Sequence, residues 1–340
     1  MKRSVVSDNQ THTHPAGPPL AELHSHLGGA VDAAILWTLA HEQGIKLPTK
    51  DYWAFERMVT IKKTGQLHAV LGLDRNFYHW TELIQSSPLA IEPAVHGTIS
   101  GAYRANNIVV HELRFNPMKR NRGGERDLDT IILAAIRGME KATLEYPMVK
   151  AGLILMFDRE FPRRLNEIIY EKAKKYQSRG IIGIDIAGPQ STKFKIEEYK
   201  DLFVEAKTQG FGVTIHTGEE GNVKEMNYIV REIGPHRIGH GFMAWRDKRL
   251  MSTLKEYGIA LELCPRSNLN VGVIKSVAEL KKIYRTLMKH GMKITINTDG
   301  PEMHGTNLRK EYEFLQKDKI FTETELKQCV ENAFEASFIQ

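Results

Sequence analysis

Histidine and acidic residues recur at the ends of four short apolar runs in this sequence. The runs end in His24-Ser25-His26, His216-Thr217-Gly218-Glu219, Gly239-His240-Gly241 and Asn297-Thr298-Asp299. Residues two apart on a strand point to the same side, so His24 and His26 are expected to face the same way. Three imidazoles and one carboxylate suit a divalent ion such as zinc, with one position left for water.

Two further residues of these motifs suit proton transfer beside such an ion. Glu219 follows His216 by three positions, and His240 ends the neighbouring run. An activated water, a carboxylic acid and a second histidine are the groups that metal-assisted hydrolysis needs. A single motif is weak evidence, because His12 and His14 repeat the His-x-His spacing in a polar leader and we assign them no function.

The elements that must position these residues alternate between short apolar runs and longer helical patterns. This alternation predicts an α/β fold, a (β/α)8 TIM barrel in which the carboxyl ends of all strands meet at one face. The predicted strands are Leu20–His26, Ile108–Phe115, Ala151–Phe157, Ile181–Ile186, Gly212–His216, Arg237–His240, Ile259–Cys264 and Lys293–Asn297.

One folded domain accounts for the sequence. Residues 1–19 are polar, contain three prolines and are predicted to be a disordered leader, whereas residues 20–340 form the barrel domain. The segment 30–106 carries Trp and Phe residues on helix-like patterns after the first strand. We expect it to be a helical insertion that covers the mouth of the barrel.

Composition narrows the class of protein. The chain has 340 residues, 41% of them hydrophobic, and a net charge of +6 that is too diffuse to indicate nucleic-acid binding. Two cysteines cannot form a disulfide framework, no apolar run approaches the ~20 residues that cross a bilayer, and the N-terminus has no secretory pattern. These features predict a cytoplasmic protein that binds a small molecule, not nucleic acid or a membrane. The oligomeric state is left open.

Each candidate residue also has a purely structural interpretation. Asp299 could cap a helix, His240 could be a turn residue between glycines, and Glu219 could belong to a solvated acidic pair. Cys264 is interpreted as a buried structural cysteine and not as a ligand or nucleophile. The coincidence of the other residues at the carboxyl ends of predicted barrel strands favours a shared site.

Together the motifs resemble the adenosine deaminase branch of the metal-dependent amidohydrolases, which includes adenosine, AMP and adenine deaminases. The resemblance runs from about Leu20 to Phe338 and agrees in order and spacing. The matching segments are Glu-Leu-His-Ser-His-Leu (22–27), Gly-Ile-Asp-Ile-Ala-Gly (183–188), His-Thr-Gly-Glu (216–219), Arg-Ile-Gly-His-Gly (237–241), Glu-Leu-Cys-Pro-Arg-Ser-Asn (262–268), Asn-Thr-Asp (297–299) and Asn-Ala-Phe-Glu-Ala-Ser-Phe (332–338).

The resemblance implies a hydrolase that deaminates purines with one zinc ion per chain. It implies that the zinc ligands are His24, His26, His216 and Asp299. Glu219 would protonate the ring nitrogen next to the amino-bearing carbon, His240 would orient and help deprotonate the attacking water, and Gly188 would donate its backbone N–H to another ring nitrogen. Burial would keep Glu219 protonated by raising its pKa, and the nearby cation opposes this.

The sequence departs from the family pattern at two substrate contacts. Gly28 stands where adenosine deaminases carry an aspartate that contacts the ribose 5′-hydroxyl, and Gly300 stands where a second aspartate contacts the purine. Loss of a carboxylate near the 5′ position removes a repulsive charge and opens space, so the predicted substrate is adenosine or deoxyadenosine, unmodified or 5′-substituted. Basic residues that could serve a 5′ anion, or could equally form a solvated basic loop, are Arg114, Lys119, Arg120 and Arg159.

Three alternatives remain open at this point. The substrate could be an adenine nucleotide (AMP or dAMP) or aminodeoxyfutalosine. A phosphotriesterase-type hydrolase would need a lysine that bridges two metals, and the end of the fourth predicted strand, residues 185–188, contains none. A purine-binding barrel without turnover is favoured by Gly28 and Gly300 and opposed by the presence of Glu219 and His240.

Overall fold

The structure of the protein is a computed structural model. It describes residues 15, 17–61, 77–121, 127–189, 194–220 and 223–339. Most of the leader predicted over residues 1–19, including His12 and His14, lies outside the described residues.

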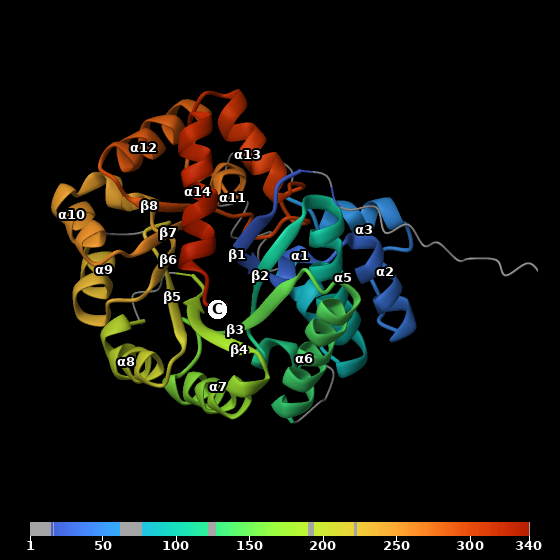
Figure 1. The fold of residues 1–340 in the computed structure, drawn as a ribbon. Coiled ribbons are helices and arrows are strands. Elements are labelled where there is room, and N and C mark those ends of the chain that lie inside the picture. Colours follow the sequence, from blue (N-terminus) through green and yellow to red (C-terminus); the bar gives the residue numbers. More distant parts are fainter. Residues whose placement is uncertain are drawn as a thin grey trace, which may run out of the picture.

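Eight parallel strands of the described chain pair in sequence order and form a ring around a central axis, along which Figure 1 looks. The prediction of a (β/α)8 barrel is therefore confirmed. The strands are β1 (Leu20–His26), β2 (Ile108–Phe115), β3 (Lys150–Asp158), β4 (Ile181–Ala187), β5 (Gly212–Thr217), β6 (Arg237–His240), β7 (Ala260–Leu263) and β8 (Lys293–Ile296).

The ring is closed between β8 and β1 by residues that follow β8. The backbone N–H of Asp299 donates to the carbonyl of His24 at 2.9 Å, and that of His26 donates to the carbonyl of Asp299 at 2.7 Å. A predicted metal ligand thus forms the last backbone link of the barrel.

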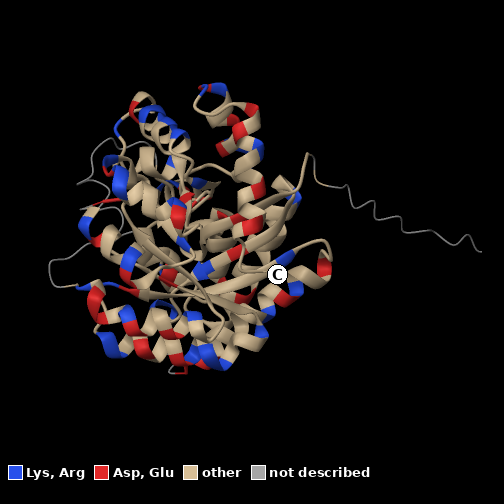
Figure 2. Cartoon of the chain, turned by 60° about the vertical axis from the view of Figure 1, so that its left-hand side comes forward, with Lys and Arg blue, Asp and Glu red and all other residues tan. Residues whose placement is uncertain are grey.

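Helices surround the strands (Figure 1). The larger ones have a buried apolar stripe and a charged outer side, and in Figure 2 basic and acidic residues are interspersed over them. None of the helices within the described ranges is long and apolar enough to cross a membrane. The helices that follow β1 to β8 around the ring, apart from those between β1 and α5, are α5 (Pro88–Asn106), α6 (Leu128–Glu145), α7 (Arg163–Tyr176), α8 (Lys200–Thr208), α9 (Val223–Tyr228), α10 (Lys248–Glu256), α11 (Pro265–Asn270), α12 (Val277–Lys289), α13 (Leu308–Lys317) and α14 (Glu323–Ala336).

Short polar side chains fix where many of these helices begin. Each accepts a hydrogen bond from a backbone N–H of the first turn, which would otherwise lack a partner. At the start of α14, Thr322 and Glu325 form a reciprocal capping box. The other capping residues include Ser87, Asp127, Asp247, Ser276 and Asn307.

Additional helices lie between β1 and β2, the segment where the insertion 30–106 is predicted. They are α1 (Leu27–Ala30), α2 (Ala33–Glu42) and α3 (Tyr52–Met58). The long α5 packs on β2 and α6, so it takes the place of the ordinary helix between two barrel strands. After α3, the N–H of Ile61 donates to the carbonyl of Met303 at 2.7 Å, which ties this segment to the loop after β8.

The contact between α5 and α6 gives a prediction about stability. A Cβ atom on Gly138 of α6 would lie 2.4 Å from the carbonyl oxygen of Glu92 in α5, whereas a Cβ on Gly101 of α5 would have open space. We expect Gly138→Ala to lower the free energy of unfolding by about 1–3 kcal/mol because the helices must move apart. Gly101→Ala is the matched control and should raise it by about 0.5–1 kcal/mol through helix propensity. Urea unfolding measures both, and a stabilised Gly138→Ala would contradict the close contact.

Candidate active site

The four predicted metal ligands lie together at the carboxyl ends of β1, β5 and β8. Nε2 of His26 is 3.3 Å from Nε2 of His24, 3.1 Å from Nε2 of His216 and 3.3 Å from Oδ1 of Asp299. Nε2 of His24 is 3.7 Å from the same carboxylate oxygen. The strand order brings these side chains together although up to 275 positions of sequence separate them (299 − 24 = 275).

The spacing of these donor atoms suits a single zinc ion. Zinc bonds to nitrogen and oxygen are about 2.0–2.1 Å long, so two ligands of a tetrahedral ion lie about 3.3 Å apart. His26 lies at this separation from each of the other three ligands, His24 and Asp299 are slightly further apart, and three borderline imidazole donors with one carboxylate are ligands that zinc accepts. The residues present therefore fit the metal that the sequence predicts.

Buried carboxylates hold two of the imidazole rings from behind. Nδ1 of His24 lies 2.6 Å from Oε2 of Glu262, and Nδ1 of His216 lies 3.0 Å from Oδ1 of Asp185. With Nδ1 engaged, each ring keeps Nε2 turned toward the shared centre. The hydroxyl of Ser267 donates to Oδ2 of Asp299 at 2.5 Å and leaves Oδ1 facing the histidines.

Arg114 of β2 links these carboxylates from inside the barrel. Its Nη1 donates to Asp185 at 2.9 Å and its Nη2 donates to Glu262 at 3.0 Å, and none of the three side chains is exposed. Burial alone would raise the pKa of the Asp185 carboxyl, but the contact with His216 and the positive charge of Arg114 outweigh it and hold that pKa below its usual value. Because Arg114 is enclosed beneath the ligands, the suggestion that it serves a 5′ anion is wrong.

The predicted acid and base lie side by side next to the ligand cluster. Oε2 of Glu219 is 3.5 Å from Nε2 of His240, and the side-chain amide of Asn268 donates to Oε1 of Glu219 at 3.3 Å. The same amide nitrogen lies 3.1 Å from Nδ1 of His240, whose ring centre is 5.0 Å from that of His24. Burial holds the pKa of His240 well below its usual value, so its ring is neutral near pH 7.

The backbone turns sharply at two of these residues. His240 has φ 58° and Asp299 has φ 67°, a left-handed conformation that costs a non-glycine residue free energy and that often marks functional sites. Asp299 does not cap the next helix, because α13 starts at Asn307, whose side chain accepts from Lys310 N–H. The helix-cap interpretation of Asp299 is therefore wrong.

The three glycines predicted at the substrate side lie at the same end of the barrel. Gly188 follows β4, and a Cβ there would lie 3.3 Å from Asp158 Oδ1. Gly300 approaches Gly29 so closely that a Cβ on Gly300 would lie 3.2 Å from Gly29 Cα. A side chain at Gly300 would push two backbone segments apart, which explains why this chain has no aspartate there.

Gly28 lies in α1, two residues after His26, and faces two large side chains. A Cβ on Gly28 would be 3.1 Å from the ring of Tyr78 and 3.3 Å from Nη2 of Arg120. Arg120 is 3% exposed, and its Nη1 donates to Glu82 at 3.2 Å. A guanidinium thus lies beside the position at which adenosine deaminases carry an aspartate.

Like Arg120, which pairs with Glu82, the other two basic residues predicted near this end contact carboxylates. Lys119 Nζ lies 2.5 Å from Asp158, and Arg159 pairs with Glu225 at 2.8 Å and donates to the carbonyl of His216 at 2.7 Å. Of the four basic residues singled out from the sequence, Arg120 is the one that lies against Gly28.

Several residues of the site had no predicted role. Asp185, Glu262, Ser267 and Asn268 all lie in segments that carry the family resemblance, and a polar residue inside an apolar strand was the available signal for the first two. No pattern in the sequence indicated that His304 belongs to the site. Its side chain is buried 3.9 Å from Oδ2 of Asp299, and neither ring nitrogen has a hydrogen-bond partner among the described residues.

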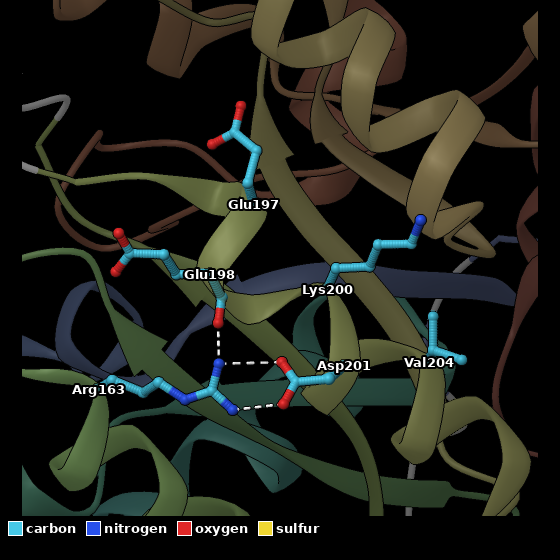
Figure 3. Close-up of a pocket in the computed structure, with 6 residues that line it drawn as sticks. All are labelled: Arg163, Glu197, Glu198, Lys200, Asp201 and Val204. Atoms are coloured by element: carbon cyan, nitrogen blue, oxygen red, sulfur yellow. Dashed lines mark hydrogen bonds and ion pairs between the residues drawn. The ribbon is translucent and has the colours of Figure 1, made fainter.

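Cys264, interpreted as structural, is buried at the start of α11 with its thiol 3.6 Å from the carbonyl of Glu262. A separate hollow lies on the outer surface between α7 and the chain that leads into α8 (Figure 3). Arg163 pairs with Asp201 there at 2.9 Å, and the six residues that line the hollow include no histidine or cysteine, so it offers no comparable chemistry.

The barrel, the converging imidazoles and the adjacent acid and base define a hydrolase of the metal-assisted class. A model of the family described as adenosine deaminase matches residues 19–340, and the chain belongs to this family of hydrolytic deaminases.

One curated relative supports this assignment, and two solved structures share the fold. An adenosine deaminase from Shewanella loihica is 30% identical over 94% of this chain and 94% of its own length. An amidohydrolase from Burkholderia ambifaria, solved with bound zinc, superposes with a TM-score of 0.83 at 21% identity and covers 95% of this chain and 86% of its own. Arabidopsis ADAL, solved in complex with IMP, has a TM-score of 0.77 at 22% identity and covers 95% of this chain and 92% of its own.

The buried charges beneath the ligands predict a pH-dependent effect of Arg114→Met. We expect a loss of about 3–5 kcal/mol in the free energy of unfolding near neutral pH, because Asp185 and Glu262 lose a buried counter-charge. In the wild type their pKa values lie below the usual range, so their contribution is present above about pH 4 and lost as the pH falls through the lowered values. In the variant, burial raises the pKa values of the two carboxyl groups, so they become protonated as the pH falls and no longer bury an unpaired charge. The difference in free energy of unfolding between variant and wild type should therefore be smaller at about pH 5 than at about pH 8.

Chemical denaturation at the two pH values measures this difference. The control is Arg179→Met, which removes a half-exposed pair with Glu140 and should cost less than about 1 kcal/mol at either pH. A loss for Arg114→Met that is the same at both pH values would contradict the argument.

Proposed function

We propose that this protein is a zinc-dependent deaminase that hydrolyses the amino group of an adenine nucleoside, giving the inosine-type product and ammonia. The observation that carries this proposal is the spacing of 3.1–3.7 Å among the nitrogen and oxygen donors of His24, His26, His216 and Asp299. One zinc ion per chain would bind there and, when bound, supply Lewis-acid activation of water.

The chain's own residues would carry the protons. His240 is neutral and buried, so it would accept a proton from the attacking water and later help transfer one to the departing ammonia. Glu219 would donate a proton to the ring nitrogen beside the amino-bearing carbon, which makes that carbon more electrophilic. The amide nitrogen of Asn268 contacts both Glu219 and His240 and would fix their relative orientation.

The charge at the substrate side supports a purine with an anionic 5′ group. Gly188 would offer its backbone N–H to another ring nitrogen, and Gly300 leaves the purine without a second carboxylate. Near Gly28, the guanidinium of Arg120 would attract an anionic 5′ substituent where an aspartate would repel it.

A nucleoside 5′-monophosphate is the second candidate substrate, and Arg120 favours it. Arginine presents several N–H donors in a plane that matches phosphate oxygens, and burial strengthens that contact. The ADAL complex holds IMP, the deaminated form of an adenine monophosphate. A neutral 5′-substituted nucleoside such as aminodeoxyfutalosine would gain no charge interaction with Arg120, and the expected open space at Gly28 is occupied by Tyr78 and Arg120.

Replacement of the proposed proton donor tests the chemistry. Glu219→Gln should lower kcat by at least about 100-fold, because the amide cannot donate the same proton, while bound zinc stays at one ion per chain by elemental analysis. Glu220→Gln, one residue further along, is the control and should keep activity. Equal activity of Glu219→Gln and wild type would exclude the proposed role.

A substrate panel tests the 5′ side. The panel compares adenosine, deoxyadenosine, their 5′-monophosphates and 5′-modified adenosines by loss of ultraviolet absorbance. Arg120→Ala should lower kcat/KM for the monophosphate at least about tenfold more than for adenosine, since a buried charge-assisted contact to phosphate is lost. Lys119→Ala, which removes a basic residue paired with Asp158, is the control. A preference for unmodified adenosine that Arg120→Ala leaves unchanged would refute the 5′ assignment.

A further inference from the structure

The residues after α14 enter the end of the barrel opposite the candidate active site. In Figure 1, α14 crosses that end of the ring, and the chain end marked C lies over the centre of the strands. The carbonyl of Ala336 accepts from Nη1 of Arg237 at 2.7 Å. Oε1 of Glu112 accepts from the hydroxyl of Ser337 at 2.8 Å and from the N–H of Phe338 at 2.6 Å. This segment is therefore fixed by polar contacts to residues of β2 and β6.

The ring of Phe338 occupies space that two strands leave for it. Gly183 of β4 and Gly212 of β5 are directly paired across the sheet. A Cβ on Gly212 would lie 2.1 Å from the ring of Phe338, and one on Gly183 would lie 3.1 Å from it. The ring also covers Arg237, whose Cζ atom is 3.5 Å from the ring centre. Phe338 thus covers the guanidinium with an apolar surface.

Arg237 connects this end of the barrel to a metal ligand. Its Nη2 lies 2.5 Å from Glu112, and its Nε donates to Oε1 of Glu262 at 2.5 Å. The second oxygen of Glu262 is the one that lies 2.6 Å from Nδ1 of His24. The side chains of all four residues are fully buried, so each contact acts without competing water.

We propose that residues 336–338 are a positioning element for the metal site, acting on His24 through Arg237 and Glu262. Phe338 keeps water away from Arg237, and Ser337 and Phe338 fix Glu112 on its other side. With Arg237 held in this way, Glu262 keeps the orientation that turns Nε2 of His24 toward the metal. The inference rests on the proposed zinc site but not on the identity of the substrate.

We expect changes at Phe338 to lower zinc affinity only moderately, because Glu262 has partners besides Arg237. Arg114 donates to it at 3.0 Å and the hydroxyl of Thr214 donates to it at 3.0 Å. Loss of a group that directly contacts a metal-binding histidine typically costs 10–100-fold in metal affinity. We expect changes at Phe338, two contacts further away, to raise the zinc dissociation constant about 3–10-fold.

Zinc affinity of purified variants, measured by competition with a chromogenic chelator, tests the proposal. Phe338→Ala should raise the zinc dissociation constant about 3–10-fold. Phe338→Leu keeps an apolar group over Arg237, so its zinc dissociation constant should stay within about twofold of wild type. Phe321→Ala is the matched control. Phe321 is 3% exposed and stacks on Tyr284 away from Arg237, so its loss should lower Tm and leave zinc affinity unchanged.

The outcomes separate this inference from the proposed function. If Phe338→Ala lowers Tm as Phe321→Ala does but binds zinc with wild-type affinity, the positioning role is refuted. Should Phe338→Ala fail to fold, Ser337→Ala removes one hydrogen bond to Glu112, and unchanged zinc affinity in that variant refutes the role equally. Absence of zinc binding by the wild-type protein would instead refute the proposed metal site itself.

Discussion

The candidate site depends on the pairing of buried carboxylates with arginines inside the barrel. Glu262 contacts Arg114, Arg237 and His24 at once, and its pKa lies well below the usual value because the charges of the two arginines outweigh the effect of burial. A permanently ionised carboxylate behind an imidazole fixes which nitrogen faces the metal and strengthens that nitrogen as a donor. The interior of this barrel is therefore not only an apolar core; it also holds charge that orients the ligands.

Backbone geometry then brings the ligands to one point. Parallel strands in sequence order place every carboxyl end at the same face, and left-handed turns at His240 and Asp299 direct two side chains back toward the axis. The same face carries Gly28, Gly188 and Gly300, where missing side chains give room to the neighbouring groups.

The sequence predicted the barrel and the convergence of the metal ligands because both follow from local patterns. Apolar runs mark buried strands, and a histidine at the end of such a run has few other places to point. The role of Asp185 and Glu262 could not be read in this way, because a charge in an apolar strand is explained only by a partner that lies far away in the chain. Arg114 was misjudged for the same reason: its position near a strand end is visible in the sequence, but the side on which it lies is not. His304 and the contact between Gly28 and Arg120 depend on how loops fold over the mouth, which periodicity does not encode.

Asp299 contributes to the structure through both its side chain and its backbone. Its carboxylate belongs to the ligand cluster, and its backbone completes the seam between the last and first strands. If a metal binds as proposed, parting of this seam would also move Oδ1 of Asp299 away from the ion. Release of the metal and local opening of the barrel would then be coupled, because both require the same residue to move.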